Sequence, residues 1–200
     1  MQRLYENHKI LTYPRTDSRY ITEDIVATIP DRLKAIAQGS YRGIANELLK
    51  DKIKAHKGFV DNSKVSDHHG IIPTEESANL SRLSSEERNI YDLVVRRFLS
   101  VMLSPYEYVQ STITMEVAGE SFYARGNVSK AKGWKRAYDR SEDIAEEEED
   151  RDSQELPEVK KGDRISIISY EKKSLMTTPP PRFNEGTLLS AMENPQKYVI

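Results

Sequence analysis

Cysteine is absent from this 200-residue sequence, which excludes disulfide bonds and thiolate metal sites. There is no run of about 18 apolar residues, so no segment is expected to cross a membrane. The first residues, Met1 to Glu6, lack the apolar core of a signal peptide. Because hydrophobic residues make up 37% and charged residues 31% of the chain, we expect a modest core and much solvated surface.

The formal net charge of −2 conceals an uneven distribution of charge. Residues 142–158 hold ten acidic side chains and one basic side chain, Arg151. The rest of the chain has 29 Lys and Arg against 22 Asp and Glu, a net charge of +7. Such a basic body is compatible with a polyanionic partner, and the acidic run 142–155 is expected to form a solvated loop.

The hydrophobic pattern predicts a mostly helical first half. Thr22 is a candidate N-cap, and Pro30 is expected to kink or split the helix that follows it. A second helix is expected within residues 41–54. Ser84 and Glu87 have the spacing of a capping box. The helix after them should bury Ile90, Leu93, Val94, Phe98 and Val101.

The second half has the pattern of β structure. Alternation over residues 109–117 predicts a strand with one buried face. Further strands are expected at 121–123 and 164–170, and a helix is expected to open at 184–187. Because the chain begins and ends within such elements, we expect it to be part of a larger protein.

The segment from Leu11 to Ser18 carries the most chemical information. Tyrosine can attack phosphorus, and its phenolate is a good leaving group on return, which suits reversible cleavage. In an extended segment Arg15 shares a face with Tyr13 and could place its planar cation against a phosphate oxygen, while Thr16 and Ser18 could donate to phosphate. The same residues are also compatible with a core tyrosine followed by an ordinary turn.

Ser66 to Thr74 contains two histidines, His68 and His69. A histidine near a phosphate can donate a hydrogen bond or, when protonated, stabilise negative charge. A histidine-rich metal site is disfavoured, because the rest of the sequence offers only His8 and His56. An ordinary surface loop remains the alternative for this segment.

Taken together, the segments resemble one known family. Thr12-Tyr13-Pro14-Arg15-Thr16-Asp17-Ser18 closely resembles the active-site segment of type IA DNA topoisomerases, and Asp67 to Thr74 resembles their second signature. Pro179 to Glu193 resembles a third, and Gly133-Trp134 fits the family's arch segment. The Tyr-Pro-Arg triplet and the Met-Glu-Asn-Pro ending resemble the bacterial topoisomerase III branch. Gly70 is the main departure, because alanine is commoner there.

The resemblance implies catalytic roles for Tyr13, Arg15 and His68. Tyr13 would form a 5′-phosphotyrosine link to one DNA strand, and Arg15 would stabilise the pentavalent transition state. His68 would contact the phosphate near the scissile bond, and a second strand would pass through the break without ATP. Contacts with DNA are implied for Thr16, Asp17, Ser18, His69 and Arg182.

The resemblance also implies an α+β fold. Residues 1–103 would form a winged-helix-like domain, akin to the catabolite activator protein, that carries the tyrosine. Residues 104–176 would be part of a β-rich strand arch that includes the acidic loop 142–155, and residues 177–200 would be a linker and the start of a domain that binds single-stranded DNA. The family's metal-binding toprim domain has no counterpart here. We therefore expect Mg²⁺ ligands outside the chain, no metal within it, and no activity from the chain alone.

Single-stranded DNA is the implied partner, in the cytoplasm and at the nucleoid, with neither a membrane nor a small-molecule substrate. Exposed arch strands favour edge-to-edge association of two copies. Two alternatives stay open: a winged-helix module that binds nucleic acid without chemistry, and an interaction domain anchored by Trp134 and Tyr138. A tyrosine recombinase would need a cluster of Arg and His, and a rolling-circle nuclease a His-hydrophobe-His motif; the sequence has neither.

Overall fold

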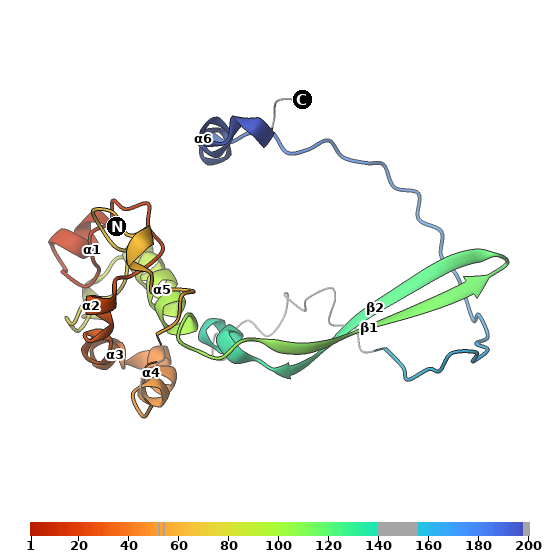
Figure 1. Ribbon diagram of the computed structural model, residues 1–200, viewed down its shortest axis with the longest axis horizontal. Coiled ribbons are helices and arrows are strands. Elements are labelled where there is room, and N and C mark those ends of the chain that lie inside the picture. The colour runs from red at the N-terminus through yellow and green to blue at the C-terminus, as the bar shows by residue number, and fades with distance from the viewer. Residues whose placement is uncertain (52, 54, 140–155, 198–200) are drawn as a thin grey trace. The chain divides into compact units, whose positions relative to one another are not determined.

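The computed structural model describes residues 1–51, 53, 55–139 and 156–197 (Figure 1). It comprises two units, Met1–Glu158 and Val159–Ile200. The acidic run 142–155, expected to be a solvated loop, lies outside the described residues. Within the described part, no helix is both long and apolar enough to span a bilayer.

The first unit starts with short helices and one long helix. The α-helices are α1 (Gln2–Glu6), α2 (Glu23–Val26), α3 (Ile29–Ile36), α4 (Arg42–Leu48) and α5 (Ser85–Ser100). Three 3₁₀ helices are interspersed: η1 (Gly39–Tyr41), η2 (Asn62–Lys64) and η3 (Leu80–Arg82). The split expected at Pro30 is confirmed, because this proline lies in the first turn of α3, where its missing N–H is tolerated.

Helix α5 begins at the expected capping box. The Ser84 hydroxyl accepts from the Glu87 amide at 3.2 Å, and the Glu87 carboxylate accepts from the Ser84 amide at 2.9 Å. The expectation that Leu93 is buried is wrong, because its side chain is 65% exposed. Leu93 follows the buried Tyr91 by two residues and therefore faces nearly the opposite side of the helix.

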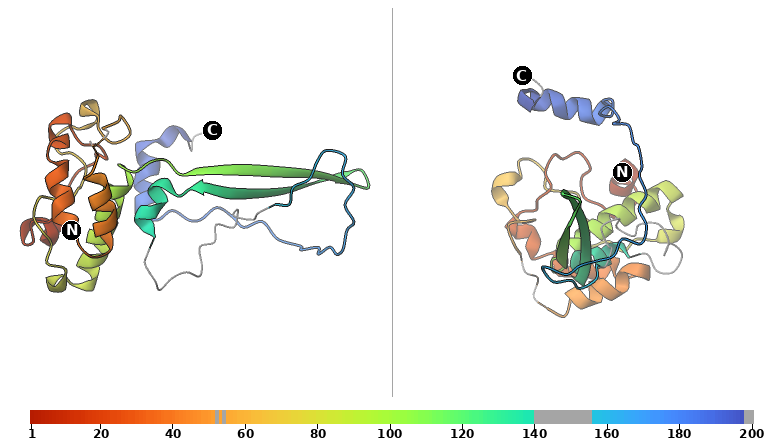
Figure 2. Two further views of the ribbon diagram at one scale, coloured as in Figure 1. Left: turned by 90° about the horizontal axis from the view of Figure 1, so that it is seen from below. Right: turned by 90° about the vertical axis from the view of Figure 1, so that its right-hand side faces the viewer.

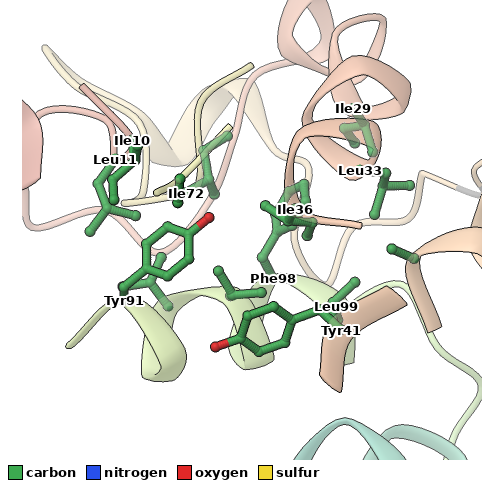
Figure 3. Close-up of a cluster of buried hydrophobic side chains, with 14 of the residues drawn as sticks. Ile10, Leu11, Ile29, Leu33, Ile36, Tyr41, Ile72, Tyr91, Phe98 and Leu99 are labelled. Carbon is green, nitrogen blue, oxygen red and sulfur yellow. The ribbon is translucent and has the colours of Figure 1, made fainter. Parts of the chain in front are cut away.

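The hydrophobic core of the first unit joins α3 and α5 to two extended segments. Figure 3 shows Ile10, Leu11 and Ile72 beside the ring of Tyr91, with Phe98 further along α5. Ile10 and Leu11 are separated from Tyr13 only by Thr12, and Ile72 lies three residues after His69. Packing of this core therefore fixes both signature segments from their buried sides.

The β structure that precedes residue 107 in the described part of the chain consists of two isolated bridges. Leu11 pairs antiparallel with Pro73, and Ile21 pairs parallel with Val60. With the strands described next, the first unit combines helices and a sheet, which agrees with the expected α+β class.

Strands β1 (Glu107–Val117) and β2 (Glu120–Ala131) form a two-stranded antiparallel ribbon, visible in Figures 1 and 2. Ala118 and Gly119 connect them with positive φ values of 54° and 86°, as a two-residue hairpin turn of the primed type requires. The expected buried face of β1 is formed only in part: Ile113, Met115 and Val117 are half-buried and alternate with exposed residues, but no residue of the strand is fully buried. An alternating sequence pattern indicates a strand, but a face of that strand is buried only where a second layer of structure packs against it.

The ribbon returns to the helices through the 3₁₀ helix η4 (Gly133–Tyr138), which packs against α5. The Arg96 guanidinium donates to the carbonyl of Ala137 at 2.8 Å. Gly133 has φ +47°, and a Cβ at this position would overlap the carbonyl group of Pro105.

The second unit contains helix α6 (Glu185–Glu193) and the 3₁₀ helix η5 (Pro195–Lys197). Asn184 caps α6, since its side chain accepts from the Thr187 amide at 2.8 Å, as expected from the sequence. The strand expected at 164–170 is not formed, and Ile168 is 99% exposed. A strand needs a hydrogen-bonding neighbour, and no strand pairs with this segment among the described residues.

Candidate active site

The two signature segments meet through their backbones. The Thr12 amide donates to the carbonyl of Ile72 at 3.0 Å, and the Ile72 amide donates back to the Thr12 hydroxyl at 3.0 Å. One step further, the Thr74 amide donates to the carbonyl of Ile10 at 3.2 Å. Residues 60 positions apart in sequence are thereby held in a fixed register, just before Tyr13.

The ring of Tyr13 contacts two other rings. Its centroid is 4.3 Å from that of His68, with an interplanar angle of 39°. The ring of Tyr5 meets Tyr13 edge-on, with centroids 5.4 Å apart and an angle of 87°. The structure therefore brings together the predicted nucleophile and the predicted histidine, and it adds an aromatic neighbour that the sequence patterns did not indicate.

The loop after Tyr13 is tied to the histidine loop by side-chain hydroxyls. Thr16 donates to the carbonyl of His68 at 2.8 Å, and Ser18 donates to the carbonyl of Lys64 at 2.8 Å. The Gly70 amide donates to the carbonyl of Tyr20 at 2.7 Å. These contacts hold the loop of His68 beside the Tyr13 segment. The predicted contacts of Thr16 and Ser18 with DNA stay predictions.

Arg15 and Asp17 point away from this framework, since both are exposed. Among the described residues, the Arg15 guanidinium has neither an ion pair nor a hydrogen bond. A cation two residues from Tyr13 that is unpaired in this way can meet an incoming phosphate without first breaking a protein contact.

Among the described residues, the ring contacts of Tyr13 are with Tyr5 and His68 and do not include His69. The His69 Nδ1 atom lies 2.8 Å from the carbonyl oxygen of Gly70. The hydrogen bond from Thr22, with a smaller contribution from His69, lowers the pKa of Asp24. Arg182 is exposed and lies in the second unit, so its predicted contact with DNA stays a prediction.

Helix α1, which carries Tyr5, is attached to the start of α5 by charge. The carboxylate of Glu87 lies 3.2 Å from the Arg3 guanidinium and 3.6 Å from the His8 imidazole. The backbone hydrogen bond from Ser84, followed by the charges of Arg3 and His8, lowers the pKa of Glu87. The capping box marks Glu87 in the sequence, but Arg3 and His8, the basic residues beside it, are distant in sequence and could not be inferred from that motif.

Comparison with known proteins gives the family. The DNA topoisomerase family matches residues 1–196 of the chain. The chain belongs to this family. It is 52% identical over 199 residues to DNA topoisomerase 3 of Bacillus thuringiensis strain Al Hakam, and 49% identical over 199 residues to DNA topoisomerase 3 of Bacillus subtilis strain 168. The resemblance to the bacterial topoisomerase III branch is confirmed.

The alignments with both bacterial topoisomerases cover 100% of this chain and 27% of each relative. The topoisomerase chain thus spans about a quarter of the length of the relatives it matches. Within its described residues, no group of three His, Cys, Asp or Glu side chains is arranged to hold a metal ion. The described residues therefore do not fit a magnesium site.

Proposed function

We propose that the protein containing this chain is a type IA DNA topoisomerase of the topoisomerase III kind, and that Tyr13 is its nucleophile. The proposal rests above all on the contact between Tyr13 and His68, which two paired signature segments hold at a centroid distance of 4.3 Å. Membership of the DNA topoisomerase family supports the reaction class. The whole protein would act on DNA in the bacterial cytoplasm, at the nucleoid.

In the proposed reaction the Tyr13 phenolic oxygen attacks a phosphodiester phosphorus of a single strand. The phenol loses its proton as its oxygen bonds to phosphorus, the bond from phosphorus to the 3′ oxygen breaks, and the 3′ oxygen takes up a proton and leaves as a hydroxyl, so no proton is gained or lost overall. Arg15 and His68 stabilise the charge that builds up on the phosphoryl oxygens. The phosphotyrosine conserves the energy of the broken bond, so after strand passage the 3′ hydroxyl can reverse the step without ATP.

For the remainder of the chain, we propose the division that the resemblance implies. Residues 1–103 form the winged-helix-like tyrosine domain, residues 104–176 form part of the strand arch, and residues 177–200 lead into the domain that binds single-stranded DNA. Thr16, Asp17, Ser18, His69 and Arg182 are proposed to contact the bound strand. Magnesium would be held by residues outside the chain.

The decisive test is covalent trapping on the full-length protein. A 3′-labelled single-stranded oligonucleotide should become attached to the wild type, and peptide mapping should place the label on Tyr13. Tyr13→Phe should abolish the adduct but leave the dissociation constant for the oligonucleotide within about twofold, because only the nucleophilic oxygen is lost. A non-chemical DNA-binding module predicts no adduct in either protein, and that outcome would refute the proposal.

The chain alone is proposed to be inactive in relaxation, since it lacks the toprim domain. The purified 200-residue chain should leave supercoiled plasmid unchanged with Mg²⁺ present. Tyr13→Phe, purified in parallel, controls for contaminating enzyme. Relaxation by the wild-type chain but not by Tyr13→Phe would contradict the need for further residues.

A further inference from the structure

Arg32 is a deeply buried cation that none of the sequence motifs includes. It lies on α3 and is 6% exposed, although an arginine is costly to bury unless its donors are satisfied. Burial lowers its pKa, opposed by the charge of Glu75. Its position therefore calls for an explanation in terms of what its guanidinium holds.

Three partners surround the guanidinium. Its Nε donates to the hydroxyl of Thr28 at 2.8 Å, and its Nη2 pairs with the Glu75 carboxylate at 2.8 Å. The third and shortest contact runs from Nη1 to the carbonyl oxygen of Pro73, at 2.6 Å. Thr28 and Glu75 orient the plane of the group. Pro73 lies near the end of the signature segment Asp67 to Thr74, which also contains the two histidines.

The strand geometry explains why this carbonyl needs a partner. Pro73 pairs with Leu11, and the hydrogen bonds between the two segments run from the flanking residues, Thr12 to Ile72 and Thr74 to Ile10. In an antiparallel pair bonded this way, the N and the carbonyl of the central residue point away from the facing strand. A proline is tolerated there because it has no N–H to satisfy, while its carbonyl points outward to Arg32.

We propose that Arg32 is a positioning residue for the strand-cleavage reaction. Arg32 binds the segment of His68 on the edge that faces away from the Tyr13 segment, and the Tyr13 segment binds it on the opposite edge. Arg32 thereby sets the location of the imidazole relative to the tyrosine. The proposal rests on the proposed function, because it presupposes that Tyr13 and His68 act on the same phosphate. It assigns Arg32 no contact with DNA.

The test uses the full-length protein and single-turnover formation of the covalent adduct on a 3′-labelled oligonucleotide. Arg32→Met should slow adduct formation roughly 10- to 100-fold, the effect expected when a reacting group is displaced by a fraction of an ångström to 1 Å. Arg32→Lys should recover part of the rate, because an ammonium group can still donate to the Pro73 carbonyl. Oligonucleotide affinity should stay within about twofold. Arg88→Met, the same change at an exposed site on α5, is the matched control and should retain the wild-type rate.

A double-mutant cycle with His68→Ala separates positioning from general loss of structure. If Arg32 acts through His68, Arg32→Met should slow the His68→Ala protein less than about twofold, because the group it positions is already gone. An equal slowing in both backgrounds would overturn the proposal. If Arg32→Met does not fold, the cycle is run with Arg32→Lys, and the same two outcomes decide. If the Tyr13→Phe protein formed the adduct as well as the wild type, the proposed function itself would be refuted. If Arg32→Lys and Arg32→Met formed the adduct at the wild-type rate, and the adduct still required Tyr13, only the role of Arg32 would be refuted.

Discussion

Gly70 stands at a close approach of the two loops that form the candidate site. A Cβ built there would lie 3.2 Å from the carbonyl carbon of Arg19 and 3.3 Å from the carbonyl oxygen of Ser18. These contacts are tight, but a shift of a few tenths of an ångström relieves them. The φ of Gly70 is not in the left-handed region, so the backbone itself accepts alanine.

Gly70→Ala should therefore change stability little. The gain from a less flexible unfolded chain, about 0.4–1 kcal/mol, opposes a similar loss from the tight contacts. We expect a net change within about 1 kcal/mol in urea unfolding of the chain. Gly70→Val, which adds two methyl groups against the Arg19 backbone, should lose more than about 2 kcal/mol, and equal stability of the two variants would contradict this reading of the site.

Gly133 presents the opposite case, because both conformation and space exclude a side chain. Its φ of +47° favours glycine, and a Cβ would overlap the Pro105 carbonyl group. Gly133→Ala should destabilise the base of the ribbon by at least about 2 kcal/mol. The adjacent Trp134 is the only tryptophan of the chain, so its fluorescence during urea unfolding reports the change directly.

Gly119→Ala is the matched control for this substitution. Gly119 also has a positive φ, +86°, but no atom lies within 4 Å of the Cβ that alanine would add. The Gly119→Ala variant should lose only the stability that the unfavourable positive φ costs, about 1 kcal/mol. If both variants lost the same stability, the overlap with Pro105 would have no energetic role.

At the scale of elements, the attachment of α1 to α5 depends on an ionised Glu87. Its pKa is lowered in the folded chain, so it contributes stability above its ordinary pKa of 4.5, and this contribution is lost as pH falls through the folded value. The thermal midpoint of the wild type should therefore fall on acidification below about pH 5. Glu87→Gln should be less stable near neutral pH and lose part of this dependence.

Glu86→Gln provides the comparison, because Glu86 lies in the same first turn of α5 but is exposed. The thermal midpoint of the Glu86→Gln variant should follow that of the wild type across the acidic pH range. Differential scanning calorimetry at several pH values measures all three proteins. Identical profiles for Glu87→Gln and the wild type would show that the anchor adds nothing to stability.

These elements also show what could be predicted from the sequence. The capping box was predictable because two residues only three positions apart, Ser84 and Glu87, determine it. The strand predicted at 164–170 is not formed, because an alternating sequence pattern cannot supply a pairing partner. Tyr13 and His68 were predicted from short sequence motifs, and the structure places their rings in contact, while their catalytic roles stay predictions. Arg32 and Tyr5 contact residues that only folding brings near, so no local pattern marked them.

At the scale of the whole molecule, the ribbon leaves one edge of each strand unpaired in the described part of the chain. Several of its aromatic side chains are also open to solvent; Tyr108 is 50%, Phe122 52% and Tyr123 66% exposed. Unpaired edges with apolar side chains favour pairing with another strand. The isolated chain should therefore associate reversibly, and its sedimentation coefficient should rise with concentration in the micromolar range.

Tyr123→Lys should shift this association to higher concentration, because a charge on an open ribbon resists burial against a second copy. Tyr170→Lys is the control, since Tyr170 is 90% exposed but lies in the second unit, outside the ribbon. In the proposed full-length protein, other residues of the arch cover the edges of the ribbon. The full-length protein should therefore sediment as a monomer at the concentrations where the isolated chain associates. If the isolated chain stayed monomeric at all concentrations, or if both substitutions weakened its association equally, the ribbon edges would not drive association.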